Sequence, residues 1–305
     1  MSAKPIPTPA KSGLDPRADP LGRNSSNGLR AAVIGGGPAG LQAALTLGRM
    51  HINTLLFDDG AYRNDRSERM HNVIGWDGKA PAEFRAAGRA ELRAYPWVSV
   101  IEERVSDARR TDAGLVVVTA GSEWSVDRLL LACGVQDAML PIPGIAELWG
   151  DVVLPCPYCH GHEFAPGPIA VISSGGHAEH VAGLLRGIAA SVPVVAPDEV
   201  TGVTRTPSGV AIALRDGSDI HAGCVFIPPN PSPRVSFANS LGIAASAEGI
   251  EVDALGRTSS AQVWAAGDVA RRLDPRIPAA VITALASGLI AAADIAVSIA
   301  AERDS

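Results

Sequence analysis

The chain has few aromatic residues, few cysteines and no excess of basic residues, and each shortage excludes a class of protein. Aromatic residues make up 4% of the 305 positions, which disfavours a surface on which bases or sugars stack. Four cysteines do not form a disulfide scaffold. A formal net charge of −6 argues against a general nucleic-acid binder. With 47% hydrophobic residues, the chain can bury a large core and form about two domains.

The sequence also lacks a clear membrane or export segment. Residues 31–48 carry no charge, but glycines and a proline interrupt them. Residues 278–293 are uncharged too, yet this run is shorter than the roughly 20 residues of a membrane span. We interpret it as a buried helix. Residues 1–29 contain prolines and polar residues without an apolar stretch, so we expect a disordered tail. These features predict a cytoplasmic protein without membrane attachment.

Two successive patterns of strand, glycine loop and helix indicate two nucleotide-binding folds. The first has an apolar strand over 29–34, a glycine cluster and a helix over 38–50. The second, which is weaker, has a strand over 169–172 and a helix over 178–190.

The first pattern is completed near the end of the chain by a buried strand over 263–266. We therefore predict an α/β fold of two Rossmann-like domains, with the second inserted into the first. Residues 30–145 and 245–305 form the split domain, and residues 146–244 form the inserted domain.

The first glycine cluster satisfies the G-x-G-x-x-G pattern of dinucleotide-binding folds. Gly35 permits the tight turn, Gly37 lets the backbone approach a pyrophosphate, and Gly40 permits close packing of the helix. An acid, Asp58, follows Gly40 by 18 residues and can accept hydrogen bonds from ribose hydroxyls. The alternative is a glycine-rich turn with solvated Asp58 and Asp59. We favour dinucleotide binding.

The most informative segment is the C-x-x-C motif of Cys156 and Cys159, which is followed by His160. Its spacing allows a redox-active dithiol, with His160 exchanging protons near neutral pH. A metal site would use both cysteines with His160 and His162, although adjacent residues converge poorly on one ion. A structural disulfide is the third possibility. The position between two nucleotide-type folds favours the redox pair, and no metal is expected.

Two further cysteines, Cys133 and Cys224, stand alone in apolar strand contexts. We expect both to be small buried hydrophobic residues.

Together these motifs resemble those of the low-molecular-weight thioredoxin reductase family of flavoproteins, over residues 30 to 302. Its other signs are Ala132-Cys133-Gly134 and Gly267-Asp268. In that family an FAD domain is split by an inserted NADPH domain that carries the cysteines. The resemblance implies a final helix, starting near Pro278, whose N-terminus faces the flavin. It implies FAD contacts at Gly35, Gly37, Pro38, Ala39, Gly40, Asp58, Asp59, Arg63, Asn64, His71, Ala132, Gly267, Asp268, Pro278 and Ala279.

The segment Cys-Pro-Tyr-Cys-His-Gly-x-Glu more narrowly resembles the dithiol oxidases that close disulfides in natural products of the gliotoxin and holomycin type. The segments Tyr62-Arg63-Asn64 and Met70 to Trp76 share this resemblance. Ordinary thioredoxin reductases have an aspartate after the second cysteine, where this chain has His160. That subgroup more often has tyrosine at the position of His162.

The second nucleotide motif lacks two features of an NADPH site. Ser173 stands where the first motif has its turn glycine, and serine resists a positive φ. Asp198 and Glu199 follow the next strand, where a 2′-phosphate would need arginine. We therefore expect weak or absent NADPH binding.

These observations predict a homodimeric FAD-dependent thiol:disulfide oxidoreductase, and more narrowly an oxidase. A small-molecule dithiol would attack Cys156, Cys159 would pass electrons to the flavin, and dioxygen would reoxidise it. His160 would take the substrate proton. The alternatives are an NADPH-dependent reductase of thioredoxin-like proteins and a non-catalytic flavin redox sensor.

Overall fold

The computed structural model describes residues 29–271, 274 and 277–303, so the expected tail falls, but for Leu29, outside the described residues. The described chain forms two compact units. Unit 1 comprises the described parts of Met1–Tyr62, Glu83–Gln136 and Ser232–Ser305, and unit 2 comprises Arg63–Ala82 and Asp137–Pro231. The divisions therefore lie nine residues before the expected 145/146 and 13 before 244/245. Residues 63–82, which we expected in the split domain, belong to unit 2.

Unit 1 contains a five-stranded parallel sheet, in the order β19-β7-β1-β2-β3. Short apolar runs form its strands, because a parallel sheet covered on both faces buries nearly every side chain. The strands are β1 (Arg30–Ile34), β2 (Asn53–Phe57), β3 (Val98–Ile101), β7 (Arg128–Leu131) and β19 (Val263–Ala265).

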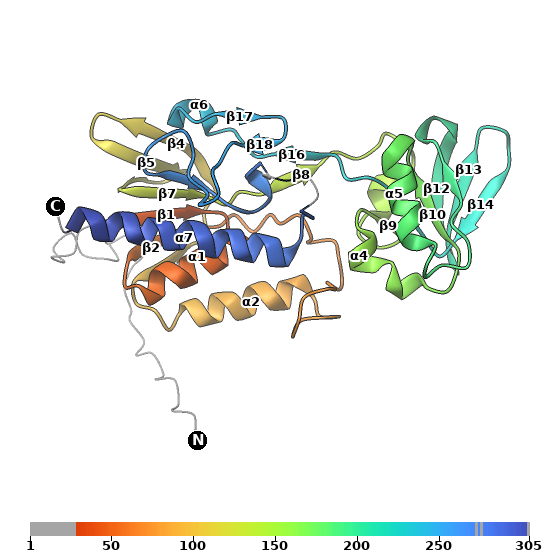
Figure 1. Ribbon diagram of the computed structural model, residues 1–305, viewed down its shortest axis with the longest axis horizontal. Helices are drawn as coiled ribbons and strands as arrows, with labels where there is room; N and C mark the ends of the chain where they lie inside the picture. Colours follow the sequence, from red (N-terminus) through yellow and green to blue (C-terminus); the bar gives the residue numbers. More distant parts are fainter. Residues whose placement is uncertain (1–28, 272–273, 275–276, 304–305) are drawn as a thin grey trace, which may run out of the picture. The chain divides into compact units, whose positions relative to one another are not determined.

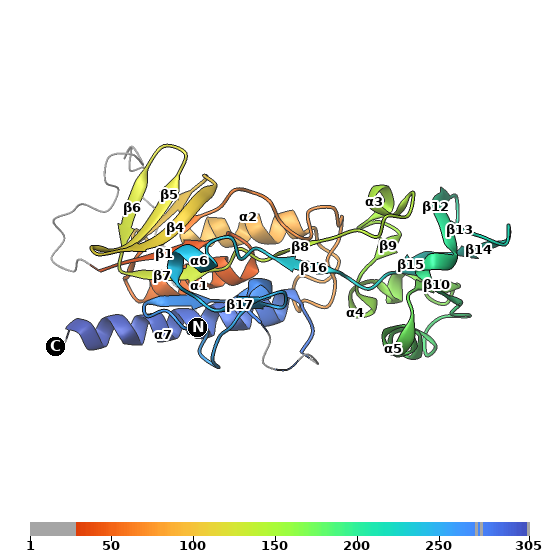
Figure 2. The same ribbon diagram turned by 90° about the horizontal axis from the view of Figure 1, so that it is seen from above.

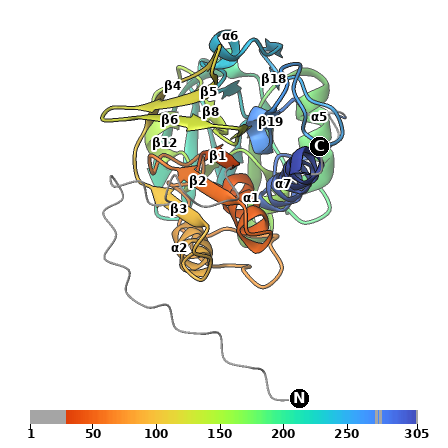
Figure 3. The ribbon, with the colours of Figure 1, turned by 90° about the vertical axis from the view of Figure 1, so that its left-hand side faces the viewer.

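Alternate side chains of each strand supply two separate cores. In β1, Ala31 and Val33 pack toward the helices, whereas Ala32 and Ile34 pack on the opposite face. The helices on the first face are α1 (Pro38–Arg49), α2 (Pro81–Leu92) and α7 (Val281–Arg303), as Figures 1 and 3 show. The other face is covered by the antiparallel strands β4 (Val105–Thr111), β5 (Gly114–Thr119) and β6 (Glu123–Val126), together with α6 (Ala238–Leu241), β17 (Ala245–Ser246) and β18 (Gly249–Ile250).

Helix α7 is buried on one side only, which corrects the expected buried helix. Gly288 lets it approach α1 closely, since a β-carbon there would lie 2.2 Å from the carbonyl oxygen of Ala39. The opposite side exposes Leu289 and Val297. By length and composition, Val281–Glu302 is long and apolar enough to cross a membrane, with 33% of its most apolar window buried. Helices that pack on a globular core meet the same test, so this is weak evidence of a span.

Unit 2 is built on a smaller parallel sheet in the order β11-β10-β15-β9. Helix α5 (Gly175–Leu185) packs on it through Val181 and Leu185, and an antiparallel sheet adds Val210 and Ile212 to the same core. Figure 2 shows these elements from above. The parallel strands are β9 (Val153–Leu154), β10 (Ile169–Ile172), β11 (Val194–Val195) and β15 (Cys224–Phe226). The antiparallel strands are β12 (Val200–Thr206), β13 (Gly209–Leu214) and β14 (Asp219–Ala222).

Short elements complete the described chain: α3 (Ile145–Leu148), η2 (Pro197–Glu199) and η3 (Gly267–Val269), with β8 (Val135–Asp137) paired to β16 (Pro231–Pro233). Two helices differ from the sequence prediction. Helix α5 spans Gly175–Leu185 instead of 178–190, and the last helix begins at Val281.

Candidate active site

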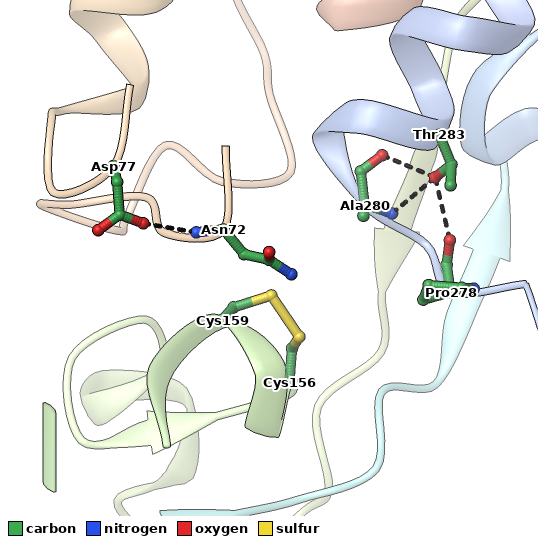
Figure 4. The surroundings of a disulfide bond; sticks show 7 residues. All are labelled: Asn72, Asp77, Cys156, Cys159, Pro278, Ala280 and Thr283. Carbon is green, nitrogen blue, oxygen red and sulfur yellow. Dashed lines mark hydrogen bonds between the residues drawn. A yellow bond between two sulfur atoms is a disulfide. The ribbon is translucent and has the colours of Figure 1, made fainter. Parts of the chain in front are cut away.

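The two cysteines of the C-x-x-C motif form a disulfide in unit 2 (Figure 4). Cys156 is the N-cap of the short helix α4 (Pro157–His160), and Pro157 takes the first helical position. This single turn brings the Cα atoms of Cys156 and Cys159 to 5.3 Å. Sulfur atoms bonded to each other are not available as metal ligands. Among the described residues, no group of three or more His, Cys, Asp or Glu is arranged to hold a metal ion.

His160 follows Cys159 directly and is partly buried. Burial lowers the pKa of His160 below its ordinary value of 6.5, while the nearby Glu163 carboxylate opposes that shift and His71 adds to it. Glu163 lies on the next turn, η1 (His162–Phe164). Because its pKa is lowered, the imidazole stays unprotonated at neutral pH and can accept a proton.

His71 lies beside His160, also within unit 2. Their ring centroids are 6.1 Å apart and the rings meet edge to face, at 82°. Nδ1 of His71 lies 3.4 Å from Glu163 Oε1 and 3.5 Å from Asp77 Oδ2. The structure thus brings two histidines and two carboxylates together next to the cysteine pair. The expected role of His71 in binding FAD stays a prediction.

Residues 63–82 are tied to the rest of unit 2 by arginines. Arg63 donates two hydrogen bonds of 2.7 Å, from Nε and Nη2, to the Asp137 carboxylate. Arg66 donates to the carbonyl oxygen of Ala146. Arg63 was expected among the FAD contacts, together with Asn64. Its guanidinium here fixes the loop, and any contact of either residue with FAD stays a prediction.

The glycine motif of unit 1 forms a cradle at the start of α1. Gly35 has φ +110°, and a β-carbon there would lie 2.3 Å from the carbonyl oxygen of Ala132, so only glycine fits. Gly37 faces open space, with no heavy atom within 4 Å of an added β-carbon. No side chain caps this end of α1, and Pro38 occupies its first turn. Free N–H groups and open space at a helix N-terminus fit the pyrophosphate of FAD.

The second part of the predicted FAD site packs against the same helix end. A β-carbon on Gly267, at φ +73°, would lie 3.0 Å from Cβ of Ala39. The Gly267 N–H donates to Ser287 Oγ of α7 at 2.9 Å. The topology therefore brings Gly267-Asp268 to the start of α1, as a split FAD site requires. That these residues bind FAD stays a prediction.

The predicted ribose acid, Asp58, is 3% exposed and already has protein partners. Its Oδ2 accepts hydrogen bonds from the Tyr62 hydroxyl and from Arg89 Nη2. Burial, followed by the hydrogen bond to Asp58, raises the pKa of Tyr62 to about 12. The neighbouring Asp59 is exposed, and its Oδ1 accepts from the Ala61 N–H at 3.1 Å. Arg89, which lies on α2, was not identified from the sequence.

Pro278 and Ala279, which were expected at the start of the last helix, lie in a turn before it. Thr283 Oγ1 donates to the Pro278 carbonyl oxygen at 3.0 Å and accepts from the Ala280 N–H at 3.1 Å (Figure 4). The helix therefore begins at Val281, and Pro278 and Ala279 precede it. The helix start expected near Pro278 therefore lies three residues later, at Val281, and contact of Pro278 and Ala279 with FAD stays a prediction.

The second nucleotide motif makes the same hydrogen bond to the neighbouring strand as the first, but its residue with positive φ lies at a different position. The Ser173 N–H donates to the Val195 carbonyl oxygen at 3.0 Å, as the Gly35 N–H does to Phe57 at 2.8 Å. The positive φ falls at Gly175 and not at Ser173. After β11, Glu199 Oε2 accepts from the Ala196 N–H at 3.2 Å.

One arginine, Arg215, reaches this acidic turn of unit 2. Its Nε donates to the backbone carbonyl oxygen of Asp198. Its backbone N–H donates to the Glu199 carbonyl oxygen at 2.9 Å. The sequence analysis did not identify this residue. The contact fixes the turn, and the side chains that follow β11 are acidic.

Of the other two cysteines, Cys224 is buried as expected, whereas Cys133 is only partly buried. Cys224 is 0% exposed, and burial raises the pKa of its thiol. Cys133 is half-buried, and burial raises the pKa of its thiol to about 12. Glu163 and Asp77 were not identified from the sequence. Glu163 lies three residues after His160, and its place at the end of the Cys-Pro-Tyr-Cys-His-Gly-x-Glu segment could have indicated it.

Comparison with known proteins identifies the family. The model of the pyridine nucleotide-disulphide oxidoreductase family matches residues 29–199 and 191–288. A protein of Claviceps purpurea, thioredoxin reductase tcpT, is 33% identical over 89% of this chain and 96% of its own length. Thioredoxin reductase aclD of Aspergillus oryzae is 30% identical over 77% of this chain and 87% of its own length.

Solved structures agree with this comparison. An oxidoreductase from Agrobacterium tumefaciens is 32% identical with a TM-score of 0.79, covering 88% of this chain and 98% of that one. HlmI is 30% identical with a TM-score of 0.80, covering 92% and 95%. The fold is the predicted one of two Rossmann-like domains of the thioredoxin reductase type. The chain belongs to the pyridine nucleotide-disulphide oxidoreductase family and is an FAD-dependent disulfide oxidoreductase.

Proposed function

We propose that this enzyme is an oxidase that closes an intramolecular disulfide in a small-molecule dithiol, with dioxygen as the electron acceptor. The observation that carries the proposal is His160, an unprotonated base next to Cys159, with a second histidine beside it. A thiol substrate near pKa 8.5 is mostly protonated at pH 7, so its oxidation requires a base.

The chain's own residues carry the thiol–disulfide exchange. His160 removes the proton of one substrate thiol, and the resulting thiolate attacks the Cys156 sulfur. The Cys156–Cys159 bond breaks, a substrate–Cys156 bond forms, and Cys159 leaves as a thiolate. The second substrate thiol then displaces Cys156, which closes the product disulfide and leaves both cysteines reduced.

Electrons and atoms balance over the cycle. The dithiol loses two electrons to the cysteine pair and two protons to His160, which passes them to solvent. Dioxygen takes up the two electrons and two solvent protons. Bound FAD supplies the acceptor through which the electron pair passes from the cysteines to dioxygen. The overall conversion is dithiol plus dioxygen to disulfide plus hydrogen peroxide. Residues proposed to hold FAD are those of the two loops at the start of α1, with Gly37 and Asp268 at their centres.

We further propose that NADPH binds weakly or not at all. Ser173 replaces the turn glycine without adopting a positive φ, and Asp198 and Glu199 occupy the turn after β11. Two acids repel a 2′-phosphate, and Arg215 is directed to a backbone oxygen.

Anaerobic flavin reduction tests these proposals. Purified holoenzyme is mixed without oxygen with dithiothreitol or, separately, with NADPH, and the flavin absorbance is followed before and after air is admitted. Bleaching by the dithiol, recovery in air with hydrogen peroxide, and slow or no bleaching by NADPH are expected. Rapid bleaching at micromolar NADPH, or no recovery in air, would overturn the oxidase.

The second candidate is an NADPH-dependent reductase of a thioredoxin-like protein. Similarity to proteins that are named thioredoxin reductases supports this candidate. The NADPH arm of the same experiment separates the two candidates.

We also propose a cytoplasmic homodimer. The exposed side of α7 presents only apolar side chains at helical spacing over residues 282–301, including Ile282, Leu289, Ile290 and Val297. A self-complementary apolar stripe of this kind suits a two-fold contact between copies of the chain.

A further inference from the structure

His71 is held in one position by a closed loop, residues 70–79. The Met70 N–H donates to the Lys79 carbonyl oxygen and the Gly78 N–H donates to the Met70 carbonyl oxygen, both at 2.9 Å. Asn72 has φ +60°, and its N–H donates to Asp77 Oδ1 at 2.7 Å (Figure 4). These bonds close the loop around the His71 ring, which is 15% exposed.

Two carboxylates face the same ring nitrogen of His71. Glu163 Oε1 and Asp77 Oδ2 both lie within 3.5 Å of Nδ1. Carboxylates at this nitrogen keep the proton of the neutral ring on Nδ1 and leave Nε2 as the acceptor. In the part of the chain that the structure describes, neither Nε2 of His71 nor His160 has another hydrogen-bond partner.

The two histidines differ in what surrounds them. Glu163 and His71 are the charged or titratable groups that act on His160. The groups that face His71 are His160, Glu163 and Asp77, and His162 acts on Asp77. His71 therefore has two carboxylates and His160 has one. The Asp77 side chain, 65% exposed, connects His71 to water.

We propose that His71 is a relay residue that receives the substrate proton from His160 and releases it to water along Asp77, an inference that rests on the proposed dithiol oxidation. Each turnover delivers two thiol protons to His160, so this base must be emptied between the first and second thiol. The ring centroids are 6.1 Å apart, and one bridging water would connect the two imidazoles. No electrons move in this step, and the proton leaves as hydronium.

The proposal has a variant and a matched control. His71→Asn keeps a hydrogen-bonding side chain of similar size but cannot carry a proton. His180→Asn changes an exposed histidine on α5 in the same unit. Reduction of the Cys156–Cys159 bond of the holoenzyme by dithiothreitol is followed anaerobically from pH 6 to 10, with rapid alkylation and mass spectrometry. Protein thiols are counted together with the flavin absorbance, because the cysteines pass the first electron pair to FAD and only the second pair remains as protein thiols.

For His71→Asn we expect a rate about 10-fold below wild type at pH 7, less than the roughly 10²–10⁴-fold of a direct general base, because His71 acts through His160. The difference in rate between His71→Asn and wild type should disappear above the pKa of the attacking thiol, because hydroxide then makes the thiolate. Added imidazole should restore the rate of His71→Ala at pH 7. The control should match wild type throughout.

A second variant keeps the histidine and removes only a carboxylate. Asp77→Asn retains an acceptor for the Asn72 N–H and should slow the reaction less than His71→Asn, with the loss again largest at low pH. Wild-type rates in His71→Asn at every pH, or a loss that neither pH nor imidazole relieves, would overturn the relay. Failure of the wild-type enzyme itself to react with the dithiol would instead refute the proposed oxidase.

Discussion

Asp58 occupies the space next to Gly36, so that a β-carbon on Gly36 would lie 2.1 Å from Asp58 Oδ2. Gly36→Ala must therefore displace the carboxylate from Tyr62 and Arg89. We expect this crowding to lower the free energy of unfolding by about 1–3 kcal/mol. Urea denaturation of the holoenzyme measures it, with FAD content determined in parallel. An unchanged urea midpoint would show that Asp58 can be displaced without a loss of folding free energy.

Substitutions at the neighbouring Gly37 test FAD binding apart from folding stability. A β-carbon on Gly37 meets nothing within 4 Å, so Gly37→Ala should fold with wild-type stability. Gly37→Glu places a carboxylate where the pyrophosphate is expected and should abolish FAD binding by charge repulsion. The measurement is flavin absorbance per mole of protein. Stoichiometric FAD in Gly37→Glu would contradict the proposed cradle.

Asp294 of α7 ties the last helix to the sheet, and its effect depends on pH. It accepts hydrogen bonds from Arg257 Nε and Nη2 at 2.6 Å and from Trp264 Nε1 at 2.9 Å. Arg257 most of all, with help from Trp264, lowers the pKa of Asp294 below 3.8, although burial opposes the shift. Because the folded pKa is lowered, this stabilisation is complete above the unfolded pKa and is lost as the pH falls through the folded value.

We therefore expect Asp294→Asn to destabilise the protein by about 1–3 kcal/mol at pH 7, the range for hydrogen bonds to a charged group. The difference from wild type should shrink below pH 4. Denaturation midpoints between pH 3 and 7 test this. A loss that stays constant with pH would mean that the charge of Asp294 contributes nothing.

The two cysteines should differ in reactivity if Cys156 faces substrate. In Cys159→Ser, the remaining Cys156 should react rapidly with an aromatic disulfide and retain a stable mixed disulfide. In Cys156→Ser, Cys159 should react much more slowly. Release of the aromatic thiolate gives the rates, and mass spectrometry gives the site. The reverse order would exchange the two roles.

The lowered pKa of His160 sets the acid limit of the reaction. Because its unprotonated form is the base, the rate of thiol attack should fall with a midpoint below pH 6.5. His160→Ala should lose roughly 10²–10⁴-fold near neutral pH and recover partly at high pH. Glu163→Gln removes the charge that raises the pKa of His160, so the midpoint should move to lower pH. A shift to higher pH would contradict the assignment.

The exposed side of α7 makes the dimer testable. Leu289→Glu and Val297→Glu place charges on side chains that are 47% and 65% exposed in the single chain. Both should yield monomers in light scattering after size-exclusion chromatography, because a buried unpaired charge is costly at an interface. Leu255→Glu is the control, since Leu255 is 40% exposed outside the helix. Dimers that persist in both variants would place the contact elsewhere.

The buried strands and the glycine cradle could be predicted from the sequence because one local pattern determines each. β10 matches the predicted range 169–172 and β1 lies within the predicted range 29–34, since continuous apolar runs flanked by loops identify buried strands. The strands β4 and β12 were missed, as in Val105-Ser-Asp-Ala-Arg-Arg-Thr111, because polar residues dominate a strand with one face toward solvent.

The histidine pair could not be predicted, because it depends on where a loop folds back. His71 and His160 are 89 positions apart, and no periodic pattern links them. The Arg63–Asp137 pair that anchors residues 63–82 to unit 2 is likewise a contact between distant segments. The sequence provides the chemical types of such residues, and the tertiary fold determines which of them meet.

The raised thiol pKa values of the buried Cys224 and the half-buried Cys133 make the unmodified chain suited to thiol counting. Both thiols stay protonated at neutral pH, because burial raises the pKa of each. A maleimide applied to the native, freshly reduced protein should therefore label two of its four cysteines. The number of labels per chain then reports the oxidation state of a single pair, without a cysteine-depleted background.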